Sequence, residues 1–172
     1  KKKNMKKILI IILTIILCSG CKSTSQSTIE SSTINYNNEF NTYYGYLTIP
    51  KIKMHQGFYN TTNKLNDVSK NIELINTGIK NTYLFAAHSG VGNIAYFNDL
   101  RYLKTGDEIK LELKTITYIY KVVEIKKEPK TGKITIPNKE NQIILTTCDQ
   151  IEKGKQLIII ASLIDTKNPS NN

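Results

Sequence analysis

Residues 142–150 read QIILTTCDQ, a stretch in which apolar and strand-forming residues lead into two threonines and then Cys148. A short apolar run of this kind, bounded by turn residues, is typical of a β-strand. Cys148 is the only cysteine after residue 21. The stretch therefore raises two questions: which sheet this strand joins, and why the strand ends on a lone thiol.

Similar short runs recur along the chain on both sides of this stretch. They are separated by polar and glycine-containing turns, and several alternate apolar with polar residues. Eight short strands favour a mainly β domain that folds as a mainly antiparallel barrel or sandwich. The predicted strands cover residues 44–49, 52–59, 72–75, 82–88, 108–114, 116–126, 142–148 and 156–164.

Two connections between these strands have a helical pattern. One is residues 63–70, and the other is YFNDLRYL at residues 96–103. In the second, Phe97, Leu100 and Leu103 recur at a spacing of three and would share one face of a helix. The domain is therefore expected to contain one or two short helices.

The first 21 residues have the features of an export signal. They combine a basic start with an apolar run at residues 8–18 and then small residues. The run is short for a membrane span, which needs about 20 residues. The segment LCSGC at 17–21 resembles a bacterial lipobox in which Cys21 would be lipidated, although Cys18 stands where leucine is commonest. A lipid anchor, an uncleaved signal anchor and full release all remain open, and each places the domain outside the cytoplasm.

The segments that flank the predicted domain are polar. Residues 22–42 are rich in Ser, Thr and Asn and predict a flexible tether, and residues 165–172 predict a disordered tail. The net charge is +10, but five of the 24 basic residues lie within the first seven positions. The remaining excess suits an anionic cell envelope or membrane surface. Because these lysines are scattered and accompany no aromatic-basic motif, nucleic acid is not expected as a partner.

Cys148 itself has two interpretations. A single cysteine in the folded part cannot form a disulfide framework, which needs an even set. A free cysteine is most often a small buried hydrophobic residue. Alternatively, Cys148 is a nucleophile, which requires a neighbouring base or cation to maintain the thiolate.

The two histidines are the candidates for that partner. His88 ends the apolar run TYLFAAH and is followed by SGVGN, whose glycines predict a loop, so it lies at a favourable place for a site. His55, in IKMHQGF, alternates with polar neighbours and is interpreted as an ordinary surface residue. The separations of His55, His88 and Cys148 do not match zinc-ligand spacing, so neither a metal nor another cofactor is expected.

Four segments of the chain together form a recognisable pattern. In chain order they are YGYLTIPKI at 44–52, NTYLFAAHSG at 81–90, an FxxLxxLxxGD pattern at 97–107, and ILTTCD at 144–149. Their order and spacing resemble those of the sortases of Gram-positive bacteria. The resemblance covers about residues 43–164. It implies that this part of the chain is a closed eight-stranded β-barrel with catalytic function.

The resemblance further implies a cysteine transpeptidase, a thiol endopeptidase of the hydrolase type. Such an enzyme cleaves an LPxTG-like sorting signal of a surface protein through a thioester and transfers the protein to an amine of a cell-wall precursor or a pilin. By position, Cys148 would be the nucleophile, and His88 would be the acid and later the base. The enzyme would act at the extracytoplasmic face of the membrane, held there by its N-terminal anchor.

The chain departs from the family at the third site residue, an arginine on the strand after the cysteine. Aligning IIIAS at 158–162 with the family's last strand places Gln156 at that position, with Lys155 beside it. Arg101, the only arginine in the chain, lies in the predicted helix at 96–103. Gln156 can donate a hydrogen bond without charge, and losing one donor to the oxyanion typically costs about 10²–10³ in rate. Lys155 could supply the charge only through a slip or bulge in the strand.

Three functions therefore remain open at the level of sequence. The first is a transpeptidase with a substituted third residue, either fully working or slow. The second is a catalytically impaired barrel that binds sorting peptides without cutting them. The third is a non-enzymatic envelope lipoprotein in which the thiol of Cys148 is structural.

Overall fold

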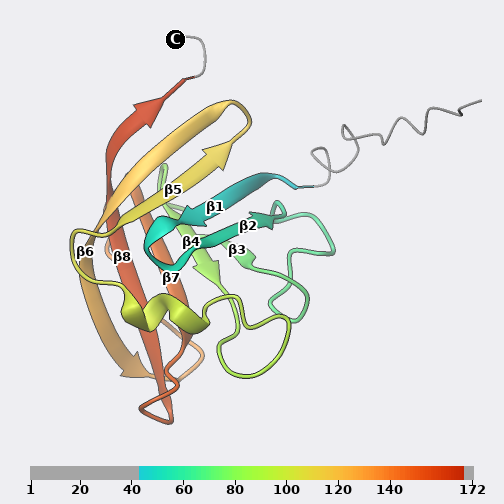
Figure 1. The fold of residues 1–172 in the computed structure, drawn as a ribbon, viewed down its shortest axis with the longest axis vertical. Coiled ribbons are helices and arrows are strands. Elements are labelled where there is room, and N and C mark those ends of the chain that lie inside the picture. The colour runs from blue at the N-terminus through green and yellow to red at the C-terminus, as the bar shows by residue number, and fades with distance from the viewer. Residues whose placement is uncertain (1–42, 169–172) are drawn as a thin grey trace, which may run out of the picture. The chain divides into compact units, whose positions relative to one another are not determined.

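The computed structural model describes residues 43–168. In this part of the chain, eight strands form one sheet that curls into a nearly closed barrel (Figure 1), in the order β2-β1-β5-β6-β8-β7-β4-β3. The paired strands are antiparallel except β4 and β7, which are parallel. The elements are β1 (Gly45–Ile49), η1 (Pro50–Ile52), β2 (Met54–Phe58), β3 (Glu73–Asn76), β4 (Tyr83–Ala86), η2 (Asn98–Tyr102), β5 (Glu108–Leu113), β6 (Ile116–Pro129), β7 (Gln142–Cys148) and β8 (Lys155–Lys167).

The predicted mainly β fold and all eight strands are confirmed, whereas the start of the predicted tail is wrong. Strand β8 continues to Lys167, which pairs with Thr117 of β6. Backbone pairing with a neighbouring strand therefore extends the strand into residues whose polar composition predicts disorder. The export segment with Cys21, the tether and residues 169–172 lie outside the described residues. Within residues 43–168, no helix has the length and apolar character needed to cross a membrane.

The helix predicted at residues 63–70 is wrong, because this segment consists of turns. The side chain of Asn63 accepts a hydrogen bond from the backbone N–H of Leu65 at 2.8 Å. The side chain of Asp67 accepts one from the N–H of Ser69, also at 2.8 Å. Such local bonds from Asn and Asp compete with helical hydrogen bonding and favour turns.

The helix predicted at residues 96–103 is the 3₁₀-helix η2, which is shorter than expected. Phe97, Leu100 and Leu103 are all buried, as their spacing indicated. A 3₁₀-helix has 3.0 residues per turn, so residues three apart lie directly above one another. A strict spacing of three therefore fits this helix better than an α-helix.

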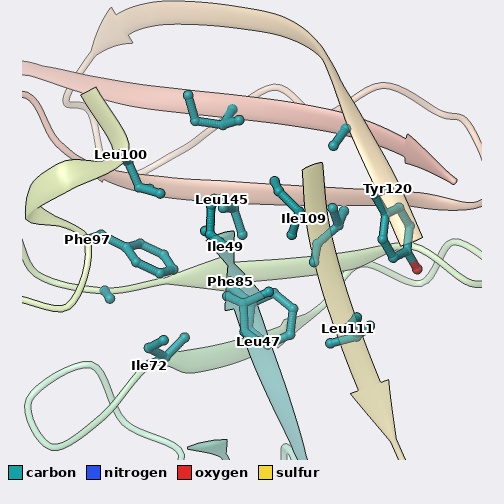
Figure 2. Close-up of a cluster of buried hydrophobic side chains, with 14 of the residues drawn as sticks. Leu47, Ile49, Ile72, Phe85, Phe97, Leu100, Ile109, Leu111, Tyr120 and Leu145 are labelled. Carbon is teal, nitrogen blue, oxygen red and sulfur yellow. The ribbon is translucent and has the colours of Figure 1, made fainter. Parts of the chain in front are cut away.

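The interior of the barrel is one continuous hydrophobic core. Figure 2 shows Phe85 of β4 and Leu47 of β1 within this cluster, with Phe97 and Leu100 at one end of it. The ring of Phe85 contacts that of Phe58 edge-on, with 4.8 Å between centroids. These five side chains are fully buried, and this core fixes the strands that carry His88 and Cys148.

A second apolar cluster, which we call the outer cluster, lies on the other face of β4, β7 and β8. It explains why the first four residues of β7 are all buried, although alternate residues point to opposite faces. Ile144, Thr146 and Cys148 alternate along β7 on this outer side, so the outer cluster leads toward the thiol. Its buried members are Leu84, Ile144, Ile158 and Ile160, with Ile75, Ile134 and Ile136 packed against them.

Candidate active site

The parallel pairing of β4 and β7 brings His88 and Cys148 to the same end of the barrel. Ala86 lies opposite Thr146 in this pairing, and each candidate residue follows two positions later. Adjacent strands are about 4.8 Å apart, so the two residues leave neighbouring strands side by side. Cys148 is the last residue of β7, as predicted, whereas β4 ends at Ala86 and places His88 in the loop beyond it.

Two side-chain hydrogen bonds join the loop that carries His88 to the end of β7. The buried hydroxyl of Thr147 donates to the carbonyl of Ala87 at 2.8 Å. The hydroxyl of Ser89 donates to the carbonyl of Cys148 at 2.6 Å. The residues immediately before and after His88 are therefore tied to Thr147 and Cys148. Sequence reasoning did not identify Thr147 or Ser89 as site residues, although they flank the two candidates in ILTTCD and AAHSG.

Both candidate residues are accessible from outside the barrel. Cys148 is a free, partly exposed cysteine, and His88 is exposed. A cysteine with only a packing role would be expected in the core, so partial exposure at a strand end favours the nucleophile interpretation. His55 lies on β2, where Thr48 contacts its Nδ1 at 2.8 Å and the ring of Tyr46 stacks on it. Its surface position agrees with its interpretation as an ordinary surface residue.

Gln156 lies directly opposite Cys148 in the antiparallel pairing of β7 with β8. Its side chain is nearly buried, with 8% exposed, and its Nε2 donates to the carbonyl of Lys133 at 2.9 Å. Lys155, one position earlier, is exposed and forms an ion pair with Glu152. The structure therefore places Gln156 beside the thiol without a strand slip, and it gives the Lys155 ammonium a different partner.

A charged network fixes the turn that follows Cys148. The carboxylate of Asp149, with a side-chain exposure of 6%, lies 2.6 Å from Nζ of Lys127, which also contacts Glu152 at 2.8 Å. Burial alone would raise the pKa of Asp149, but the hydrogen bond from Lys127 and the backbone N–H groups of Ile151 and Glu152 lower the pKa below its usual value. Asp149 therefore remains an ionised, paired carboxylate next to the thiol.

A small cavity of about 130 Å³ adjoins Cys148. Apolar side chains, including those of Phe97 and Leu157, line it together with Arg101 of η2. The guanidinium of Arg101 donates to Oε1 of Gln150 at 3.0 Å. The only arginine in the chain, which does not match the family motif in sequence, thus lies at the same end of the barrel as Cys148. Within residues 43–168, no three His, Cys, Asp or Glu side chains gather in a way that could hold a metal ion.

Comparison with known protein families matches residues 47–164 to the sortase domain. The chain belongs to the sortase family. The matched residues include His88, Cys148 and all strands except the first residues of β1 and the last residues of β8. Members of this family are cysteine transpeptidases that act on proteins with sorting signals, and they are typically membrane-associated enzymes outside the cell.

Solved sortase structures share the barrel. Sortase A of Listeria monocytogenes superposes with a TM-score of 0.63 at 23% identity, over 76% of this chain and 92% of that chain. Sortase C of Streptococcus pneumoniae gives 0.60 at 22% identity, over 72% and 70%. Sortase C2 of Group B Streptococcus pilus island 1 gives 0.59 at 23% identity, over 72% and 75%. At these identities the likeness shows a shared fold. A comparison with curated protein sequences gives no match.

Proposed function

We propose that this sortase is an active cysteine transpeptidase in which Cys148 is the nucleophile and His88 is the general acid and base. One observation carries the proposal: the two hydrogen bonds Thr147–Ala87 and Ser89–Cys148 hold an exposed imidazole and a partly exposed thiol at one end of adjacent parallel strands. A nucleophile requires a base within reach, and an exposed strand end gives a peptide access to both groups.

The two residues would carry out acyl transfer in two steps. The sulfur of Cys148 attacks the threonine carbonyl of an LPxTG-like sorting signal, the peptide C–N bond breaks, and the leaving amine takes a proton from His88. An acceptor amine then attacks the thioester and gives a proton to His88. The new C–N bond forms as the C–S bond breaks, which regenerates the thiolate. The acceptor is an amine of a cell-wall precursor or of a pilin.

The position of the outer cluster suggests where the sorting peptide binds. Its apolar side chains lie on the face of β7 that leads to Cys148, and the segment between β6 and β7 covers it through Ile134 and Ile136. A peptide that places its threonine carbonyl at the thiol and extends along this face would bring its leucine and proline to the edge of the cluster. The partly buried Ile75, Ile134 and Ile136 lie there, whereas the four buried members are at most 6% exposed. Burial of such side chains supplies binding free energy in proportion to the apolar area removed from water.

Gln156 is the weaker element of this site. Its Nε2 hydrogen bond to the Lys133 carbonyl supports a role in anchoring the segment between β6 and β7. Support of the oxyanion would require this amide to change partner, and Lys155 would have to leave Glu152. We therefore propose that electrostatic support of the oxyanion is reduced in this enzyme and that chemistry is correspondingly slow.

The location of the enzyme follows from its first 42 residues. We propose that the export segment, with Cys21 as a lipid anchor or the apolar run as a signal anchor, tethers the barrel to the extracytoplasmic face of the membrane. The surface proteins that carry the sorting signal would meet the enzyme there. Mass analysis of the mature protein from membranes would test this, since a lipid on Cys21 and an intact apolar segment differ in mass.

The proposed activity is tested by intact-mass analysis of the purified full chain incubated with LPxTG-like peptides. We expect an acyl adduct that maps to Cys148, and we expect no adduct in Cys148→Ala. A peptide vinyl sulfone provides an irreversible version of the same experiment. Peptide binding without an adduct would instead indicate a barrel that binds sorting signals without cutting them. This is the second candidate function, and the glutamine at position 156 in place of the family's arginine favours it. Neither binding nor adduct would indicate a non-enzymatic envelope protein.

Gln156→Arg is expected to raise the rate of thioester formation by about tenfold or more, because it adds a charged donor opposite Cys148. Single-turnover acylation of the full chain measures the effect. Lys155→Arg is the matched control, since it introduces the same group one residue earlier at an exposed position paired with Glu152, and we expect no change. If neither wild type nor Gln156→Arg forms a thioester, loss of the arginine does not explain the inactivity, and the enzyme assignment fails.

A further inference from the structure

Asn98, the first residue of η2, lies between the loop that carries His88 and the turn that follows Cys148. Its Nδ2 donates to the carbonyl of Gly90 at 2.8 Å, and its Oδ1 accepts from the backbone N–H of the same residue. The same Oδ1 also accepts from Nε2 of Gln150. Gly90 is two residues after His88 and Gln150 is two residues after Cys148, so one carboxamide bridges both loops.

The donor and the acceptor of every hydrogen bond in this bridge are determined. A backbone N–H can only donate and a backbone C=O can only accept, so Gly90 determines which atom of the Asn98 amide is oxygen and which is nitrogen. Gln150 must then donate to Asn98, which leaves its Oε1 to accept from Arg101 at 3.0 Å. Only a side chain with both a donor and an acceptor on one planar group can satisfy Gly90 and Gln150 together.

The bridge rests on a rigid base. Phe97 and Leu100, on either side of Asn98, are fully buried and lie at one end of the core (Figure 2). The backbone N–H of Phe97 also donates to the carbonyl of His88 at 3.0 Å. Gly90 has φ of 123°, a conformation that favours glycine. The amide of Asn98 therefore holds an otherwise permissive residue against a packed helix.

We propose that Asn98 is a positioning residue of the transfer reaction, which sets the separation at which the His88 imidazole and the Cys148 thiol act together. This inference rests on the proposed function. It assigns Asn98 no contact with the substrate: the residue acts through Gly90 on the His88 loop and through Gln150 on the turn after Cys148. Misplacement of a catalytic group by about 1 Å can lower a rate by about 10², so loss of this bridge would lower catalysis more than binding.

Asn98→Leu removes the three hydrogen bonds and keeps the number and branching of the side-chain heavy atoms. We expect kcat for thioester formation to fall by about tenfold to 10²-fold, with KM for the peptide changed less than about twofold. The matched control is Asn66→Leu. Asn66, in the β2–β3 connection, makes the same two-way bond to the backbone of Leu74, at 2.9 and 2.7 Å. This variant loses equivalent hydrogen bonds away from the site, and we expect it to leave kcat unchanged.

Two further variants separate positioning from general loosening. Asn98→Asp keeps the acceptor for Gly90 and Gln150 but loses the donor, so we expect its kcat to lie between those of wild type and Asn98→Leu. Gln150→Leu keeps both bonds between Asn98 and Gly90 but removes the two bonds that join Gln150 to η2, from Asn98 and from Arg101. Its effect should not add to that of Asn98→Leu, because both variants interrupt one bridge. Additive losses would overturn the bridge.

A readout that does not require transpeptidation distinguishes failure of this inference from failure of the proposed function. The rate at which iodoacetamide alkylates Cys148 is compared in wild type, His88→Ala, Asn98→Leu and Asn66→Leu. We expect Asn98→Leu to match the slower His88→Ala rate and Asn66→Leu to match wild type. If these alkylation rates are observed but no thioester forms with the peptide, the positioning role of Asn98 stands and the transpeptidase assignment fails. A wild-type alkylation rate and kcat in Asn98→Leu would overturn the positioning role with the function intact.

Discussion

Replacing His88 with alanine is expected to lower the rate of thioester formation by about 10²–10⁴, the range that a positioned general acid and base supplies. The leaving amine would lose its proton donor, and the thiol would lose its neighbouring base. The parallel pairing of β4 with β7 and the Ser89–Cys148 hydrogen bond bring His88 to the end of the barrel that carries Cys148. The other histidine of residues 43–168, His55, lies on β2. Single-turnover acylation of the full chain, followed by mass spectrometry, measures the effect.

His55→Ala is the matched control for this experiment. His55 is the other histidine of the chain, and it is held on β2 by Thr48 and Tyr46. Because His55 is exposed and its ring contacts Thr48 and Tyr46 of β1, we expect its removal to leave acylation unchanged. Full activity in His88→Ala, or an equal loss in both variants, would remove His88 from the mechanism.

Phe85→Ala is expected to lower the free energy of unfolding by about 3–5 kcal/mol, the usual cost of removing a fully buried phenyl ring. Phe85 has no exposed surface and contacts Phe58 edge-on at the centre of the barrel. Small domains have total stabilities of about 5–15 kcal/mol, so this variant would be close to unfolded at 37 °C. Urea denaturation followed by circular dichroism gives the midpoint and the slope.

Ile164→Ala serves as the control for stability. Ile164 is an apolar residue of the same strand system, on β8, but 54% of its surface is exposed. Its removal is expected to change the free energy of unfolding by less than about 0.5 kcal/mol. Similar losses for Phe85→Ala and Ile164→Ala would contradict a single continuous core that depends on Phe85. Loss of acylation beyond the unfolded fraction would show that packing of Phe85 on β4 positions His88, whereas loss in proportion to that fraction would show only that the folded barrel is required.

Local patterns alone predicted much of the fold. The apolar runs predicted eight strands, because strand formation depends on short windows of alternating or continuous apolar residues. The helix expected at residues 63–70 failed because the side chains of Asn63 and Asp67 bond to nearby backbone N–H groups. Composition does not reveal whether a backbone N–H will bond to a nearby side chain or to a helical carbonyl.

The sequence by itself also selected the two candidate catalytic residues. Cys148 and His88 each follow an apolar run and precede a turn, so local sequence predicts both at strand ends. Cys148 does end β7, whereas His88 lies two residues beyond β4. The spacing of Phe97, Leu100 and Leu103 likewise predicted that they share one buried face, and the 3₁₀-helix accounts for that spacing. These features involve residues that are close together in the chain.

Only the tertiary structure decided how the site is held together. The hydrogen bonds from Thr147 to Ala87 and from Gln150 to Asn98 connect residues about 50 to 60 positions apart. A separate bond to Gln150 holds Arg101 at the cavity that adjoins Cys148. The β7–β8 register placed Gln156, rather than Lys155, opposite Cys148. Residues far apart in sequence become neighbours only after strands pair and a common core forms, so no local window contains these contacts.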